Sequence, residues 1–76
     1  MNSTVIPEVS VLAEVVTERA RQIAKWGGSS HDDKHTIDDW DYFIGTRLGD
    51  KVYFRHNMVQ IAALAIAAIE SHDRKL

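Results

Sequence analysis

The chain has no cysteine, one proline and four glycines among its 76 residues. The absence of cysteine excludes disulfide bonds and thiolate metal sites, and it suits a reducing compartment. Few prolines and glycines leave few breaks in secondary structure. A domain of this size buries a modest share of its unfolded surface and depends on a metal or on partner subunits for support. We therefore expect one domain, residues 1–76, that is stabilised in one of these two ways.

The chain also lacks a basic excess and a long apolar run. Its formal net charge is −2, whereas general nucleic-acid binding requires a basic surface. The longest unbroken apolar run, Ile61–Ile69, is about half of the roughly 20 residues that a membrane span needs. No basic region followed by an apolar segment marks a signal peptide. We therefore expect a cytoplasmic protein of a bacterial host cell, without membrane or direct nucleic-acid binding.

Hydrophobic spacing predicts an all-α fold. Three helices are expected, at about residues 7–25, 37–48 and 51–72, with a loop at 26–36. The first helix has an apolar face whose members recur three and four residues apart: Val9, Leu12, Val16, Ala20 and Ile23. Ser3 or Thr4 is expected to cap this helix.

The remaining helices carry their own signals. Thr36 followed by Asp39 has the spacing of a capping box, and Trp40 is expected in the core. The second half of the last helix is apolar on every side, so it must be buried all round. We expect three-helix protomers that assemble into an oligomeric helical bundle, a dimer or higher. The expected interface residues are Met58, Ile61, Leu64, Ala65 and Ala68. The alternative is a monomer with an exposed alanine-rich stripe.

The densest polar cluster lies in the predicted loop. His31, Asp32 and His35 offer imidazole and carboxylate groups that suit a divalent metal ion. The alternative is a solvated loop whose acids cap the next helix. Basic residues form a second cluster that could hold phosphate oxygens, because arginine binds them bidentately. The alternative is ordinary surface charge. This cluster comprises Arg19, Arg21, Lys25, Arg47, Lys51, Arg55 and His56. Trp26 and Tyr42 are candidates to stack on a base.

Four segments carry a family resemblance: Glu18–Gln22, Lys25–Gly28, His31–His35 and Val59–Arg74. Together they resemble small phage and prophage proteins described as MazG-like, relatives of the all-α nucleotide pyrophosphohydrolases. The resemblance covers most of the chain and implies an obligate helical oligomer with a nucleotide pocket between subunits. In the enzymes, Glu-Glu-x-x-Glu and Glu-x-x-Asp sets hold Mg²⁺.

This chain departs from those acidic sets. Val15 stands between Glu14 and Glu18 where a paired acid is expected, and the pair with the second spacing, Glu70 and Asp73, lies near the C-terminal end. We therefore assign no catalytic residue. A divalent metal, Mg or Mn, would be needed only if the protein hydrolyses nucleotides.

Three functions follow, in order of preference. The first is binding, and sequestration, of a nucleotide or nucleotide-derived signal of host defence. The second is protein–protein inhibition of a host defence complex through an acidic strip. The third is metal-dependent pyrophosphohydrolysis with Glu14, Glu18, Asp32 and Asp33. The strip comprises Asp32, Asp33, Asp38, Asp39 and Asp41. The expected ligand-binding residues are Glu18, Arg21, Lys25, Trp26, His31, Asp32, Asp33 and Arg55.

Overall fold

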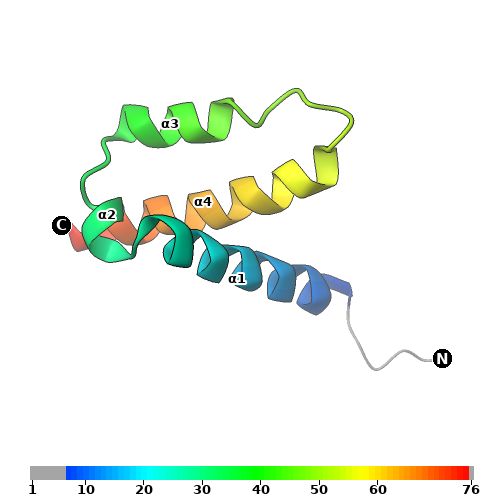
Figure 1. Cartoon of the computed structure of the whole chain (residues 1–76), viewed down its shortest axis with the longest axis horizontal. Coiled ribbons are helices and arrows are strands. Elements are labelled where there is room, and N and C mark those ends of the chain that lie inside the picture. The colour runs from blue at the N-terminus through cyan, green and yellow to red at the C-terminus, as the bar shows by residue number, and fades with distance from the viewer. Residues whose placement is uncertain (1–6, 76) are drawn as a thin grey trace.

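The computed structural model describes residues 7–75. In this range the chain forms four helices: α1 (Pro7–Trp26), α2 (Ser29–Asp32), α3 (Ile37–Gly45) and α4 (Phe54–Arg74). The expected all-α fold is therefore confirmed. Helix α4 lies in the middle and packs against each of the other three helices (Figure 1).

The helix boundaries differ from the predicted ones in the segments that connect the long helices. Helix α2 is a single turn inside the predicted loop, because the carbonyl of Gly28 accepts hydrogen bonds from the backbone N–H groups of His31 and Asp32 at 3.1 and 3.0 Å. Helix α4 begins later than expected. Asp50 Oδ1 accepts hydrogen bonds from the N–H groups of Val52 and Tyr53, which hold a turn before that helix. The predicted caps Ser3 and Thr4 lie outside the described residues.

The core of the protomer forms where α3 packs on α4. Trp40 is buried against Leu64 and Ala67, as expected for Trp40 from the sequence. Helix α3 is held in place by the predicted capping box. The N–H of Asp39 donates to Thr36 Oγ1 at 3.2 Å, and the N–H of Thr36 donates to Asp39 Oδ2 at 2.9 Å. Leu64, an expected interface residue, thus lies inside the protomer.

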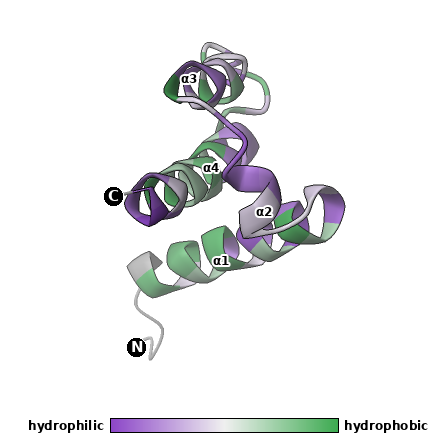
Figure 2. Ribbon diagram, turned by 90° about the vertical axis from the view of Figure 1, so that its left-hand side faces the viewer, coloured by the Kyte–Doolittle hydropathy of each residue, from purple (hydrophilic) through white to green (hydrophobic). Residues whose placement is uncertain are grey.

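Helix α1 turns the predicted apolar face away from the protomer. Val9, Leu12, Val16 and Ile23 are 55, 61, 66 and 42% exposed, and Ala20 is also exposed. We call these five residues the α1 stripe. In Figure 2, where the ribbon is coloured by hydropathy, hydrophobic positions recur along α1. The face buried against the rest of the protomer instead carries Val15, Glu18 and Gln22.

Ion pairs join α1 to α4. Arg55 on α4 donates to both carboxylate oxygens of Glu14. Arg19 donates to Glu70 of α4 at 3.1 Å. These pairs accompany the packing of α1 on α4. Across residues 7–75, no helix has the length and apolar content to cross a membrane.

Candidate functional site

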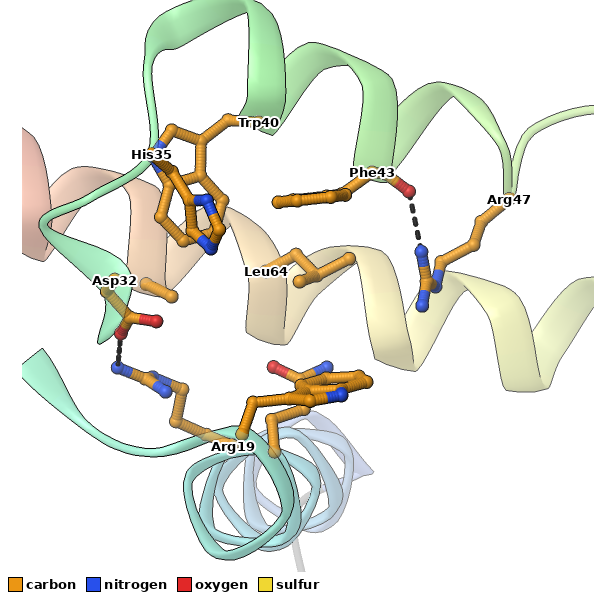
Figure 3. A pocket seen from close by; sticks show the side chains of 10 residues that line it. Arg19, Asp32, His35, Trp40, Phe43, Arg47 and Leu64 are labelled. Atoms are coloured by element: carbon orange, nitrogen blue, oxygen red, sulfur yellow. Dashed lines mark hydrogen bonds and ion pairs between the residues drawn. The ribbon is translucent and has the colours of Figure 1, made fainter.

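A cleft of about 220 Å³ opens between α1 and α3, with α4 as its floor. Because α1 and α3 both pack on α4 without substantial contact with each other, the space between them stays open at the surface. The lining residues are Arg19, Gln22, Trp26, Asp32, His35, Trp40, Phe43, Arg47, Leu64 and Ala67. Figure 3 shows the labelled side chains of α3 facing Arg19 across Leu64. The cleft therefore combines an apolar floor with aromatic and cationic walls.

Arg19 is the most enclosed cation of the cleft. Its side chain is 14% exposed, and its Nη2 donates to Asp32 Oδ2 at 2.9 Å (Figure 3) and to Glu70 Oε1 at 3.1 Å. The Nε–H of Arg19 is buried and has no hydrogen-bond partner among the described residues. An unpaired buried donor costs about 1–3 kcal/mol, so an acceptor that reaches this group would be held strongly.

Arg47 supplies a second guanidinium on the opposite wall. Its Nη1 donates to the carbonyl oxygen of Phe43 at 2.7 Å (Figure 3), and its Nε donates to Gln60 Oε1 at 3.0 Å. Both partners are uncharged, so the positive charge of Arg47 is not cancelled by a carboxylate in these contacts. The cleft thus has an arginine at each side, one of them without an ion pair in the described range.

Aromatic side chains form the wall on the α3 side. The rings of His35 and Trp40 have centroids 5.0 Å apart, and those of His35 and Phe43 are 4.9 Å apart, both edge to face. Trp40 and Phe43 are 6.0 Å apart in the same arrangement. Such contacts fix ring orientation. The rings of this wall are therefore held in fixed orientations.

Trp26 lines the α1 side of the cleft and carries two cations on its ring. Lys25 Nζ lies 5.0 Å and Arg21 Cζ 5.9 Å from the ring centroid, within the range of cation–π attraction. Both cations were expected ligand-binding residues, although neither lines the cleft itself.

The other expected ligand-binding residues lie at different distances from the cleft. Asp32 lines the cleft. Glu18 does not line it, but accepts a hydrogen bond at 3.1 Å from Nε2 of the lining residue Gln22. His31 contacts His35. Two others lie elsewhere, because Asp33 pairs with an arginine near the C-terminal end of α4 and Arg55 pairs with Glu14.

The carboxylates considered for Mg²⁺ binding each have an arginine partner. Glu14 pairs with Arg55, Glu18 with Arg21, Asp32 with Arg19, and Asp33 with Arg74. Hydrogen bonds from their arginines hold the pKa values of the Glu14, Glu18 and Asp33 carboxyls below the ordinary values. Within residues 7–75, no three histidine, cysteine or acidic side chains gather as metal ligands do. The charge of these acids is already balanced by protein groups.

Several cleft residues were not expected to bind a ligand. Arg19 and Arg47 appeared only as part of the basic cluster, and Gln22 and Phe43 were not expected at the site. One signal was present in the sequence. Arg19, Gln22 and Trp26 are spaced by three and four residues, which places them on one face of α1. That spacing identifies a polar–aromatic face, although only the tertiary structure reveals what it faces.

Comparison with protein-family models, curated proteins and solved structures found no match to this chain. The resemblance to MazG-like proteins therefore stays a prediction, and the function has to be argued from the cleft.

Proposed function

We propose that the protein binds a small ligand with a planar ring and an anionic group, of the nucleotide class, in the cleft between α1 and α3. One observation carries this proposal: a single cavity is bounded by three large aromatic side chains, an apolar floor and two guanidinium groups. Ligand sites are concave and mostly apolar, with a few convergent polar groups. The cleft has this composition.

The volume of the cleft limits the size of the ligand that it can enclose. Its volume of about 220 Å³ is below the roughly 300–1,000 Å³ of typical ligand pockets. A single ring system such as a nucleobase therefore enters the cleft, and the sugar and phosphates remain at its mouth. We expect the ring to pack beside Trp26 and the α3 wall. Arg47, whose charge no carboxylate balances, is the expected phosphate ligand, with Lys25 beside Trp26 as a second cation.

Binding is favoured over hydrolysis by the state of the acids. A two-metal or one-metal phosphohydrolase needs several carboxylates directed at one ion, whereas Glu14, Glu18, Asp32 and Asp33 each pair with a separate arginine. The acidic strip considered for inhibition of a protein complex is also divided. Its members Asp32 and Asp33 pair with arginines, and Asp39 caps α3.

A thermal-shift panel tests this proposal. Purine and pyrimidine mononucleotides, dinucleotides and cyclic nucleotides are added to the purified protein without metal. A ligand at 100 times its dissociation constant adds about 2.7 kcal/mol to the free energy of unfolding, which raises Tm measurably. Trp26→Ala and Arg47→Met should remove the shift. Tyr42→Ala is the matched control, because this exposed ring lies outside the cleft lining. The absence of a shift with every nucleotide would contradict the proposal.

We also propose that two copies of the chain associate through the α1 stripe. Four large apolar side chains on one helical face are exposed, and contiguous apolar patches usually mark contacts. A two-fold antiparallel pairing centred on Val16 sets Val9 opposite Ile23 and Leu12 opposite the small Ala20, so apolar side chains meet apolar ones. Such a pairing is self-complementary, as a two-fold interface requires.

Two neighbouring positions on α1 test the pairing. Val16→Glu puts a charge in the centre of the stripe, whereas Thr17→Glu puts the same charge on an adjacent exposed residue of the polar side. Sedimentation velocity should give a dimer for the wild type and for Thr17→Glu, and a monomer for Val16→Glu. A monomeric wild type, or a dimeric Val16→Glu variant, would refute this interface.

A further inference from the structure

Two histidines, one of which lines the cleft, bring their ring nitrogens together. His31 belongs to the single turn of α2, and His35 follows four residues later. Their Nε2 atoms are 3.3 Å apart, and the rings meet edge to face with centroids 4.8 Å apart. His31 is half-buried and the His35 side chain is 18% exposed. Both nitrogens therefore occupy a partly sheltered position beside the cleft that His35 lines.

The spacing of these nitrogens matches one edge of a tetrahedral metal site. Histidine nitrogens bind Zn²⁺ at about 2.0–2.1 Å, which at the tetrahedral angle sets two of them about 3.3–3.4 Å apart. The observed separation is 3.3 Å. We propose that His31 and His35 form a two-histidine chelate for a divalent transition-metal ion of the Zn²⁺ class. Imidazole pairs prefer such ions, whereas Mg²⁺ prefers oxygen ligands.

The two acids near these histidines are not part of the proposed chelate. Asp32, the third expected metal ligand, is buried and already accepts from Arg19 at 2.9 Å. Asp39 Oδ2 lies 3.8 Å from His35 Nδ1. This distance is too long for a hydrogen bond, so Asp39 leaves the ring free to carry its proton on Nδ1. The proposed chelate uses that tautomer, which leaves the His35 Nε2 lone pair for a metal.

When the proton of His35 is on Nδ1, the short contact between the two rings requires His31 Nε2–H to donate to His35 Nε2. Metal binding replaces this shared proton. His31 moves its proton from Nε2 to Nδ1, so both imidazoles stay neutral and no further proton acceptor is required. A small rotation of the His31 ring then directs both lone pairs at the ion.

The remaining coordination positions are exchangeable. Among residues 7–75, no third histidine, cysteine or acid joins these two rings in a metal-binding group, so water completes the coordination sphere. An ion with open positions can bind an additional donor. Because His35 also lines the cleft, this inference does not require that the proposed nucleotide-class ligand binds, but it puts an ion next to that ligand's site.

Calorimetric titration with ZnCl₂, in a buffer without nucleotide, tests the chelate. The wild type should bind one Zn²⁺ per chain, and MgCl₂ should give no heat of binding. His31→Gln should weaken binding at least about tenfold, because loss of even an outer-sphere partner costs 10–100-fold. His56→Gln is the matched control, since His56 is an exposed histidine on α4 that does not line this cleft. It should bind Zn²⁺ as the wild type does.

Co²⁺ gives a second readout. Its visible absorption distinguishes tetrahedral from octahedral coordination, and His31→Gln should lose the tetrahedral bands while circular dichroism stays unchanged. His35→Gln is a second variant, although the contacts of this ring with Trp40 make it the less tolerant position. No Zn²⁺ binding by the wild type, or equal binding by His31→Gln, would overturn the proposal. Because nucleotide is absent throughout, these outcomes are independent of the proposed ligand.

Discussion

At the scale of single residues, the ion pairs of this protein differ mainly in burial. The pair of Arg19 with Asp32 has side-chain exposures of 14 and 8%, whereas Arg74 and Asp33 are 37 and 38% exposed. Breaking a buried pair leaves a charge without a partner and costs several kcal/mol, while exposed pairs contribute little. The first pair joins α1 to α2, and both of its members line the cleft. It therefore contributes to both stability and the shape of the site.

Arg19→Met tests this difference. Asp32 would stay buried without its cation, so we expect the free energy of unfolding to fall by about 3 kcal/mol. Arg74→Met removes the exposed pair and should leave the urea midpoint almost unchanged. Equal midpoints for the two variants would mean that burial does not decide the strength of these pairs. Urea unfolding followed by circular dichroism measures both midpoints.

The lowered carboxyl pKa values predict how stability depends on pH. Arg21 lowers the pKa of Glu18, and Arg74 lowers that of Asp33, from ordinary values of 4.5 and 3.8. The backbone N–H of Thr36 lowers the pKa of Asp39. A depressed pKa stabilises the fold above the unfolded value and loses that effect as pH falls through the folded one. We therefore expect these groups to leave Tm flat above about pH 5.5, one unit above the unfolded pKa of glutamate, and to lower it progressively below that pH. A Tm that rises on acidification would contradict these assignments.

At the scale of helices, the sequence predicted where helices form but not which way their faces point. The capping pattern of Thr36 and Asp39 is local chemistry, so it identified the start of α3 correctly. The periodicity of α1 also identified a helix with one apolar face. It could not show that this face points outward, because the orientation depends on packing against α4, whose contacts join residues far apart in sequence, such as Glu14 and Arg55, 41 residues apart. Periodicity reports which side chains share a face but not the partner of that face.

The end of α3 and the turn after it each contain one glycine, and the two form a matched pair. Gly49 has a φ of +87°. Gly45 is the last residue of α3, and a methyl group added there would meet no atom within 4 Å. Gly49→Ala should destabilise the protein by about 1–2 kcal/mol, since left-handed backbone is costly for other residues. Gly45→Ala should stabilise it by about 0.5–1 kcal/mol. Thermal unfolding of the two variants should therefore shift Tm in opposite directions. A shift in the same direction would contradict the conformation of this turn.

At the scale of the whole molecule, the cleft exists because α4 separates α1 from α3. No pattern within one helix contains this arrangement. Trp26 was expected to stack on a ligand, and Trp40 to lie in the core, yet both line the same cleft. Arg47 comes from the turn after α3 and meets the cleft only through the packing of α3 on α4. The sequence therefore indicated some of the residues at the site, but it did not show which residues line the cleft together.

Self-association predicts a property of the whole molecule. If two copies pair through the α1 stripe, Tm should rise with protein concentration, because dimer formation stabilises the folded state by mass action. Val16→Glu should remove this dependence, and Thr17→Glu should retain it. Scanning calorimetry across a hundredfold range of concentration measures the effect. A concentration-independent Tm for the wild type would show that the stripe stays uncovered.

The central claim is that the cleft binds a nucleotide-class ligand, and its two tryptophans provide the most direct measurement. The chain has two tryptophans, and both line the cleft, so a ¹H–¹⁵N spectrum has one indole signal from each. Titration with the nucleotide selected by thermal shift should move both indole signals along one saturable curve. Arg47→Met should weaken that curve without altering the starting spectrum of α1. Indole signals that stay fixed while backbone signals elsewhere shift would contradict the account, because the ligand would then bind outside the cleft.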